Sequence, residues 1–433
     1  MELTKEKLNE YRTNYKNNKS NKILESALSN LELKKVIRNP RVKQSTISKF
    51  STDIKTLPVT NQEHSGRCWM FAGLNIIRES IAKKYNLEEF ELSQNYLSFY
   101  DKLEKVNYIM DSIIDLGNYT WDDRTIYWFL TFGYSEGGIW SMFQNLVNKY
   151  GIVPKDAVTE TFQALNSNQM QDLIYASIKK FTGEAKGLDY DDRVKLKDRY
   201  MEDVYDFLTM CYGVMPTKFD FEYVDKDKKY GIEKGLTPKE FYEMSGIDVD
   251  DYVVLLNAPS SNKPLNKTYT VKYSNNMTGG KDPLYLNLPI EDLKLYTEKQ
   301  LNDKLPVWFT CDCLPYFDRD NGVWDTDLYN YMDSFNLDVK ADKGLMLDFQ
   351  ISAPNHAMVF TGFNEYPKRY KIENTWGDEK GSKGYYTGTE DCFDTYVYQV
   401  AINKKYLSKE TKELLDVKPI ELDPWDPIGA VTK

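Results

Sequence analysis

Histidine and cysteine are scarce in this sequence. Its 433 residues include two histidines, His64 and His356, and five cysteines. An odd, widely spaced set of cysteines is not the pattern of a disulfide framework, and it favours a reducing, cytoplasmic location. Any reaction that needs an imidazole must use one of the two histidines. The scarcity therefore narrows the search for a catalytic base to two positions.

The sequence also lacks a basic excess and a long apolar run. Lys and Arg number 56 against 66 Asp and Glu, so the formal charge is −10. Such a charge disfavours binding to nucleic acid through a global basic field. The charge-rich residues 2–22 do not resemble a secretory signal, and no uncharged apolar segment is long enough to span a bilayer. We expect neither a membrane nor a nucleic-acid partner.

The apolar pattern changes along the chain from helical to strand-like. Helical spacing predicts helices at 23–37, ended by Pro40, from about 67, at 93–114 and at 139–150, and through much of the charge-rich 155–245. Short β-branched and aromatic runs predict strands at 252–256, 269–273, 306–311, 357–363, 370–373 and 396–402. This order predicts an α+β fold with two lobes that meet at a cleft.

Cys68 stands in the first turn of an expected helix, directly after a polar loop that contains Gly66. Helix N-terminal N–H groups and the helix dipole favour an anion, so a thiolate would be stabilised there. An unperturbed thiol, with a pKa of about 8.5, is only a few per cent ionised at pH 7, and a neighbouring imidazolium lowers that pKa. Cys68 is therefore a candidate nucleophile, with an inert buried thiol as the alternative.

His356 opens an expected strand, and Asn374 follows the next one. If these strands are antiparallel neighbours, the Asn374 amide oxygen would accept the Nδ1 proton of His356 and leave the other ring nitrogen facing a thiolate. Trp376 would cover this hydrogen bond and exclude water. His64 has no orienting partner of this kind, so we favour His356 as the base. A satisfied core histidine and a turn after a strand are the alternatives.

A serine nucleophile is a competing hypothesis. Ser135 lies in a G-x-S-x-G match at 133–137, between an expected strand at 126–132 and the helix expected from 139. That context is typical of a serine hydrolase elbow, and His356 follows it in the chain. Alternatively, Gly137 and Gly138 form a bare backbone edge that an extended peptide can approach closely.

Metal sites are not indicated. Cys311 and Cys313 offer two soft ligands without a second pair or a nearby histidine. The run 225–229 begins like a calcium loop but has Lys229 where an oxygen ligand should stand. We expect no metal and no other cofactor.

Several short motifs follow one another in a fixed order along the chain. They include Val59-Thr60-Asn61-Gln62, Ser65-Gly66-Arg67-Cys68-Trp69, Glu136-Gly137-Gly138, His356-Ala357-Met358 and Glu373-Asn374-Thr375-Trp376-Gly377. Together they resemble the papain-like cysteine peptidases, and more closely the bleomycin hydrolase and bacterial aminopeptidase C family. The resemblance covers nearly the whole chain.

The resemblance implies a role for each matching residue. Cys68 would be the nucleophile, His356 the general base and acid, and Asn374 the residue that orients the imidazole. Gln62 would donate its side-chain amide to the oxyanion beside the Cys68 N–H, and Gly137 and Gly138 would bind substrate backbone.

The spacing of the motifs exceeds that of papain-like enzymes. His356 lies 288 positions after Cys68, against about 130 to 150 in papain-like enzymes. The resemblance implies that the extra residues form helical and hook-like insertions through which subunits assemble into a homohexamer. We expect five parts: an N-terminal segment that packs on the catalytic body (1–55), a helical lobe with the nucleophile helix (56–154), an insertion for oligomerisation (155–248), a β-rich lobe (249–415) and a C-terminal arm in the cleft (416–433).

The family's arm places its terminal carboxylate against the free α-amino group of the substrate, which implies that Thr432 and Lys433 bind substrate. The family's usual ending is closer to Gly-Ala-Leu-Ala, so Lys433 would overhang here, and self-trimming of Lys433 is a hypothesis. The sequence thus predicts a cytoplasmic cysteine aminopeptidase that acts on peptides with free N-termini through a thioester. The alternatives are a serine esterase that uses Ser135 and a non-catalytic peptide-binding ring.

Overall fold

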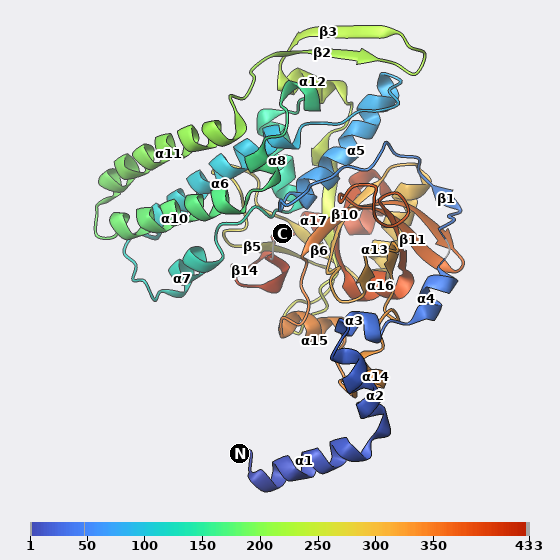
Figure 1. Ribbon diagram of the computed structural model, residues 1–433. Helices are drawn as coiled ribbons and strands as arrows, with labels where there is room; N and C mark the ends of the chain where they lie inside the picture. The colour runs from blue at the N-terminus through green and yellow to red at the C-terminus, as the bar shows by residue number, and fades with distance from the viewer. Residues whose placement is uncertain (1, 47, 430–433) are drawn as a thin grey trace.

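The chain forms two lobes, and the computed structural model describes residues 2–46 and 48–429 (Figure 1). Helices from the first half of the chain form one lobe, and a twelve-stranded sheet from the second half dominates the other. This architecture confirms the α+β, two-lobed fold that the sequence predicts. None of the helices in the described ranges is long and apolar enough to cross a membrane.

The helical lobe surrounds a helix that is buried on most of its circumference. This helix, α5 (Cys68–Lys84), packs on α6 and α8 on one side and on strands β7 and β10 on the other. The lobe contains α5, α6 (Gln94–Leu116), α7 (Arg124–Thr131), α8 (Trp140–Tyr150), α9 (Phe162–Leu165), α10 (Asn168–Ala185), α11 (Tyr190–Tyr212) and α12 (Pro238–Met244). Ser93 caps α6 as expected, because its hydroxyl accepts the Tyr96 N–H at 3.2 Å.

The large sheet runs in the order β14-β5-β6-β4-β13-β7-β10-β11-β12-β9-β8, and β1 pairs with β10 off this path. Its strands are β1 (Thr52–Asp53), β4 (Tyr252–Leu256), β5 (Lys267–Val271), β6 (Tyr285–Asn287), β7 (Val307–Cys311), β8 (Phe317–Asp318), β9 (Val323–Trp324), β10 (His356–Glu365), β11 (Lys368–Glu373), β12 (Tyr385–Thr389), β13 (Val397–Asn403) and β14 (Ile420–Leu422). β10 lies between β7 and β11, antiparallel to both.

Apolar cores lie on both faces of this sheet, because successive side chains of a strand point to opposite sides. On one face, Trp308 of β7 packs with Trp69 of α5 and Trp140 of α8. On the other, Phe309 and Phe360 pack beneath α13 (Ile290–Asn302) and α16 (Glu390–Tyr396). The first core holds α5 against the sheet.

The structure corrects two expectations about helix boundaries. The run 126–132, expected as a strand, belongs to α7, because Asp123 caps the helix and Ile126 and Phe129 bury one face at helical spacing. The helix expected at 23–37 is split into α2 (Lys19–Leu28) and α3 (Leu33–Val36). Pro40 does not end a helix but occupies the first position of α4 (Pro40–Ser45), where its fixed φ suits helix entry.

Two further regions differ from the sequence pattern. The charge-rich insertion contains a two-stranded ribbon, β2 (Phe219–Val224) with β3 (Tyr230–Leu236), besides its helices. At the N-terminus, α1 (Lys5–Asn17) and α2 bury no residue and project from the lobes (Figure 1). The expected packing on the body therefore begins only near α3, where Lys34 donates to the Leu314 carbonyl at 3.0 Å.

The remaining helices lie among the strands of the sheet lobe. They are α14 (Tyr331–Phe335), α15 (Lys343–Asp348) and α17 (Lys409–Leu415), with short 3-10 turns at Lys155–Ala157, Val249–Asp251, Lys404–Tyr406 and Pro427–Gly429. The six strands expected from residue 252 onward agree with the structure to within a few residues. The largest difference is at β5, which ends at Val271 because Tyr273 has a positive φ of 57°.

Candidate active site

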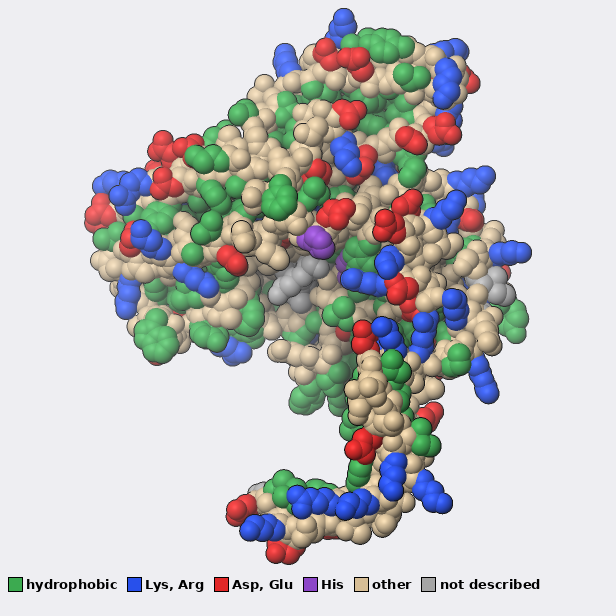
Figure 2. All heavy atoms as spheres, viewed as in Figure 1, with side chains coloured by type: hydrophobic (Ala, Val, Ile, Leu, Met, Phe, Trp, Pro, Cys, Tyr) green, Lys and Arg blue, Asp and Glu red, His purple; other side chains and the backbone are tan. Residues whose placement is uncertain are grey.

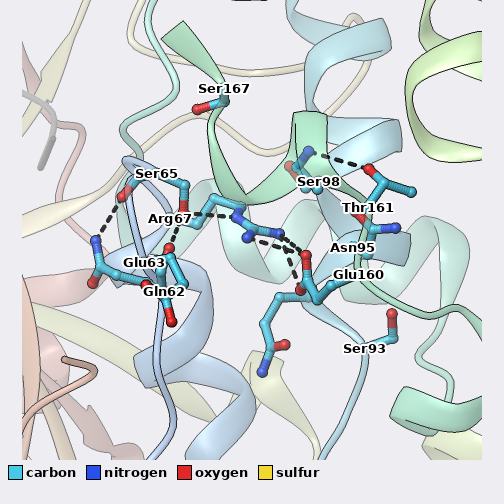
Figure 3. A network of polar contacts seen from close by, with 12 residues as sticks. Gln62, Glu63, Ser65, Arg67, Ser93, Asn95, Ser98, Glu160, Thr161 and Ser167 are labelled. Atoms are coloured by element: carbon cyan, nitrogen blue, oxygen red, sulfur yellow. Dashed lines mark hydrogen bonds and ion pairs between the residues drawn. The ribbon is translucent and has the colours of Figure 1, made fainter. Parts of the chain in front are cut away.

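The loop before the candidate nucleophile is held by its own side chains (Figure 3). Gln62 Nε2 donates to the Ser65 carbonyl at 2.7 Å, and the Ser65 hydroxyl donates to the Gln62 carbonyl at 2.6 Å. The buried Arg67 guanidinium donates to Ser65 Oγ at 2.9 Å and to Glu160 at 3.3 Å. These bonds fix the loop at the point where α5 begins.

A buried carboxylate, Glu136, joins this loop to the helical lobe. Its Oε2 accepts the Gly66 N–H and the Ser167 hydroxyl, both at 2.6 Å, and its Oε1 accepts Lys102 Nζ at 2.6 Å. Burial acts to raise the pKa of Glu136, but the cations Lys102 and Arg67 outweigh it and hold the pKa at about 2. The carboxylate is therefore charged at neutral pH and ties the start of α5 to α6.

Cys68 is the first residue of α5 and is completely buried. The first-turn amides and the dipole of a helix favour negative charge at this position. The thiolate of Cys68 is the anion that such an environment stabilises. The structure thus places Cys68 where the sequence predicts it.

Polar bonds attach α5 to the ends of the central strands. Trp308 Nε1 donates to the Trp69 carbonyl at 3.1 Å. Glu373, the last residue of β11, accepts from Asn75 at 3.0 Å and from Arg78 at 3.1 Å. The helix α5 is thereby fixed to the sheet at β7 and β11.

Cys68 lies at the same end of these strands as His356. His356 pairs with Cys311 across β10 and β7. Burial raises the pKa of the Cys311 thiol, and Cys313, Asp312 and Cys68 nearby raise it further. The loop before Cys68 is bound to the same region, because the Gln62 N–H donates to the carbonyl of Thr375, the residue after Asn374, at 2.8 Å.

His356 opens β10, and Asn374 follows the end of β11. His356 Nε2 lies 2.9 Å from Asn374 Oδ1, and the Thr375 N–H donates to the same oxygen at 2.8 Å. The second bond fixes the amide with its oxygen toward the ring, so His356 donates from Nε2. The expectation that Nδ1 makes this bond was wrong, because the ring presents Nε2 to Asn374. Nδ1 is left as the proton-accepting nitrogen.

Trp376 covers the histidine. Its ring stacks on the His356 ring with centroids 4.7 Å apart and planes 26° apart, and His356 is only 4% exposed. Burial lowers the pKa of His356 to about 4, although its bond to Asn374 acts in the opposite direction. The imidazole is therefore neutral at pH 7 and able to accept a proton.

The Gln62 side chain is held from both ends. Its Oε1 accepts the Thr375 hydroxyl at 2.6 Å, while one N–H of Nε2 is used by the Ser65 carbonyl. The second N–H of Nε2 has no acceptor among residues 2–46 and 48–429. The amide is thus oriented, with one donor left over, beside the helix that begins at Cys68.

A cavity of about 820 Å³ opens in front of these residues, lined by Gln62, Gly137, His356 and Trp376 among others. Figure 2 shows a histidine side chain in the middle of the face viewed, with acidic and basic side chains beside it. His64 also lines the cavity, but it is exposed, and within the described ranges its ring has no hydrogen-bond partner. His356 therefore has an orienting partner that His64 lacks.

Ser135 and Gly137 line the cavity from the loop between α7 and α8, and Gly138 follows them in the same loop. The strand that a serine elbow needs before Ser135 is missing, because α7 occupies 124–131. Gly137 accepts Lys105 Nζ at its carbonyl at 2.7 Å. At Gly138 a Cβ would lie 2.4 Å from the Trp69 ring, so packing on α5 requires glycine there.

The C-terminal arm is described as far as Gly429, so Thr432 and Lys433 lie outside the described residues. β14 of the arm pairs in parallel with β5, and Lys263 Nζ binds Asp426 at 2.8 Å. The arm from Pro424 onward lines a second cavity of about 380 Å³, which shares Ser135 and Gly137 with the first. The described arm therefore approaches the Gly137 end of the candidate site.

Two buried acids received no role from the sequence, Glu136 and Glu373. The available signal was their place inside the quoted motifs, directly before Gly137 and directly before Asn374. Across the described ranges, no group of three or more His, Cys, Asp or Glu side chains is arranged to hold a metal ion.

A cysteine at a helix start, a buried histidine–asparagine pair and a cleft between a helical and a β-rich lobe define a papain-like cysteine peptidase. The Peptidase C1-like family model matches residues 2–429, and the chain belongs to that family.

Similarity to individual proteins extends over the whole chain. Aminopeptidase C of Listeria innocua is 37% identical over 441 residues, which is 99% of each chain. Aminopeptidase E of Lactobacillus helveticus is 37% identical over 437 residues, again 99% of each chain. A crystal structure of PepW from Lactobacillus rhamnosis HN001 is 36% identical and superposes with a TM-score of 0.96, covering 100% of this chain and 99% of that one.

Proposed function

We propose that this cysteine-type aminopeptidase removes residues from the N-termini of peptides through a thioester acyl-enzyme. Family membership and full-length similarity to aminopeptidases C and E carry the coarser description. One observation carries the mechanism: the 2.9 Å contact between His356 Nε2 and Asn374 Oδ1, at the strand ends that face the start of α5.

In the first half of the reaction, Nδ1 of neutral His356 takes the proton of the Cys68 thiol. The thiolate attacks the carbonyl carbon of the first peptide bond and forms a C–S bond. The oxyanion receives hydrogen bonds from the remaining Gln62 N–H and from the Cys68 N–H, and losing one such donor typically costs about 3 to 4 kcal/mol. The imidazolium then gives its proton to the leaving nitrogen as the C–N bond breaks.

In the second half, a water molecule gives a proton to His356 and attacks the thioester carbon. The C–S bond breaks, the amino acid is released and the thiol is restored. Asn374 holds the orientation of the His356 ring through both proton transfers. Trp376 keeps bulk water from the hydrogen bond between His356 and Asn374. No step needs a metal or another cofactor.

The test compares Cys68→Ala, Ser135→Ala and a third thiol variant, Cys211→Ala, on aminoacyl amides. We expect Cys68→Ala to lose about 10⁴-fold or more in kcat, and the other two to retain activity. Cys211 is the matched control because it is a partly exposed thiol far along α11. A thiol-selective epoxide should label Cys68 in the wild type. Activity in Cys68→Ala, or its loss in Ser135→Ala alone, would favour the serine hypothesis.

The arm sets specificity in this proposal. The last part of the arm, with Thr432 and Lys433, binds the substrate's α-amino group through its terminal carboxylate. Only the first peptide bond of the substrate then reaches Cys68. Support comes from the described arm, which ends at Gly429 beside the cavity that shares Gly137 with the site. Removing residues 430–433 should permit internal cleavage of N-acetylated peptides. An intact mass that keeps Lys433 after long incubation of active enzyme would contradict self-trimming.

We also propose that the protein works in the cytoplasm as a homohexamer assembled through residues 155–248. The ribbon β2 and β3 stands at the edge of the helical lobe (Figure 1), in the position that a hook between subunits would need. Sedimentation velocity should reveal particles of six chains. A monomer that cleaves peptides at full rate would contradict the assembly, and assembled particles without turnover would favour a peptide-binding ring.

A further inference from the structure

Arg319 is an exposed cation that lines the cavity of about 820 Å³ but not the second cavity, which the arm lines. It lies in the turn between β8 and β9, and its guanidinium carbon sits 3.7 Å from the centroid of the Trp376 ring. The same Trp376 ring stacks on His356. The guanidinium is therefore held one aromatic ring away from the proposed base.

The turn that carries Arg319 is rigid. The Gly322 N–H donates to the Asp318 carbonyl at 3.0 Å, and Asn321 Nδ2 donates to the Asp318 carboxylate at 3.0 Å. Phe317, just before the turn, packs edge-on against Trp376 with centroids 5.8 Å apart. The direction of Arg319 is thus set by the sheet and by the aromatic surface beneath it.

The charge of Arg319 acts to lower the pKa of His356, but within residues 2–46 and 48–429 Arg319 forms no ion pair. Its neighbours in sequence are committed elsewhere: Asp318 pairs with Arg38, and Asp320 pairs with Lys380 at 2.6 Å. In the described part of the chain, no carboxylate lies within 4.0 Å of Arg319, although Glu63 and Glu379 line the same cavity. A planar guanidinium on an aromatic face, with N–H groups that donate to no atom of the described residues, suits bidentate binding of a carboxylate.

The position of the arm gives the direction of a bound peptide. If the α-amino group is held at the Gly137 end, which both cavities share, the residue after the scissile bond must extend toward Trp376 and Arg319. This step rests on the proposed function. It makes Arg319 a contact for the leaving part of the substrate.

We propose that Arg319 is a specificity-determining residue that binds a carboxylate on the leaving part of the substrate. Two sources offer this group: the side chain of an acidic residue directly after the scissile bond, and the free C-terminus of a dipeptide. Lys380 lines the same cavity but is already paired with Asp320, so it does not take this role.

The experiment measures kcat/KM for three peptides that share the N-terminal residue X cleaved best by the wild type. X-Gln amide carries no carboxylate, X-Glu amide carries one on its side chain, and the free dipeptide X-Gln carries one at its C-terminus. Wild type is compared with Arg319→Gln, with Arg319→Lys, and with Lys380→Gln as the matched control from the same cavity.

We expect the wild type to favour at least one carboxylate peptide over X-Gln amide by about three- to tenfold. The favoured peptide identifies the source of the carboxylate. Arg319→Gln should abolish the preference while leaving X-Gln amide unchanged, Arg319→Lys should keep part of it, and Lys380→Gln should keep all of it. High salt should weaken the preference, because the pair is exposed to solvent.

Equal rates on all three peptides in the wild type, or a preference that survives in Arg319→Gln, would overturn the carboxylate site while leaving the peptidase function intact. An equal loss on all three peptides in Arg319→Gln would also overturn it, because Arg319 would then act through Trp376 and His356. If the wild type cleaves none of the three, the proposed function fails and the carboxylate site fails with it.

Discussion

The imidazole of His356 is controlled by three neighbours. Asn374 binds Nε2, the Thr375 N–H fixes the Asn374 amide, and Trp376 covers the ring. Together they leave Nδ1 as the accepting nitrogen, and burial keeps the ring neutral although the bond to Asn374 acts to raise its pKa. The cost is a buried base, whose pKa of about 4 lies well below the ordinary value of 6.5. Burial of His356 therefore sets the lower end of the pH range in which the proposed reaction runs.

This burial predicts the acid side of the pH profile. Protonated His356 cannot accept the Cys68 proton, so kcat/KM should hold through pH 5 and fall only as the pH approaches about 4. Replacing Trp376 by Ala exposes the ring, raises its pKa toward 6.5 and should move the acid limb upward. Trp376→Phe keeps an aromatic cover and should leave the limb in place. If the acid limb of the pH profile does not move in Trp376→Ala, burial is not what sets the pKa of His356.

At the scale of elements, the start of α5 depends on buried groups in neighbouring elements. Glu136 ties the loop before α5 to α6, and Glu373 ties α5 to β11. Gly138 lets the loop between α7 and α8 pack on Trp69. The ends of α5, β10 and β11 are thus held by buried bonds. Changes at these positions should affect both stability and rate.

Glu136→Gln should strongly destabilise the fold. The change leaves Lys102 buried without its partner, which typically costs about 3 to 5 kcal/mol in the free energy of unfolding. The folded pKa of Glu136 is about 2 against 4.5 in the unfolded chain, so its contribution is complete above pH 4.5 and is lost as the pH falls toward 2. Urea unfolding from pH 7 to pH 3 measures both effects. Glu184→Gln, in an exposed pair with Lys180, is the control and should change little.

Gly138→Ala tests the packing of the glycine loop on α5. The new Cβ would lie 2.4 Å from a Trp69 ring that is anchored by its own hydrogen bond to the Glu136 carbonyl. Overpacking of this kind typically costs about 1 to 3 kcal/mol, and we expect lower kcat as well. Gly183→Ala, in α10 with open space around it, should instead stabilise the protein by about 0.5 to 1 kcal/mol. Thermal unfolding that ranks the two variants in the reverse order would contradict this account.

The sequence predicted the elements that are set by local pattern and missed those that depend on distant partners. Short-range spacing predicts that Cys68 stands at a helix start and that β4 is a strand. It also predicts that His356 and Asn374 meet through antiparallel neighbouring strands. Residues 126–132 are rich in strand-forming types, and only the cap at Asp123 and burial against the helical lobe make them helical. The choice of Nε2 over Nδ1 depends on ring rotation against Trp376, which no spacing encodes.

At the scale of the whole molecule, two ion pairs, one buried and one exposed, attach residues 416–429 of the C-terminal arm, besides the pairing of β14 with β5. Lys263 with Asp426 is buried, whereas Lys272 with Glu421, on β14, is exposed. The buried pair lies nearer the cavity that the arm shares with the site. It is therefore the contact on which the position of the arm should depend.

Asp426→Asn should loosen the arm and weaken the proposed restriction to N-terminal bonds. Breaking a buried pair is costly enough to change a binding equilibrium by about tenfold or more, so cleavage of N-acetylated peptides should rise relative to peptides with free amino groups by about that factor. Glu421→Gln removes the exposed partner in the same arm and should leave the ratio unchanged. The cleavage rates of N-acetylated and free-amino peptides, measured side by side, test this prediction. Equal ratios of these rates in Asp426→Asn and Glu421→Gln would argue against a role of the arm in specificity.

The order of the strands along the chain determines when the site can form during synthesis. Cys68 lies in the first sixth of the chain, but β10 and β11, which carry His356 and lead to Asn374, emerge from the ribosome nearly 300 residues later. β14, which anchors the arm, is made last of all and pairs with β5 about 150 residues behind it. A nascent chain therefore holds its thiol without a base for most of its translation. In the proposed mechanism it can cleave a peptide only after Asn374 has been made, about 50 residues before the strand that guides the arm.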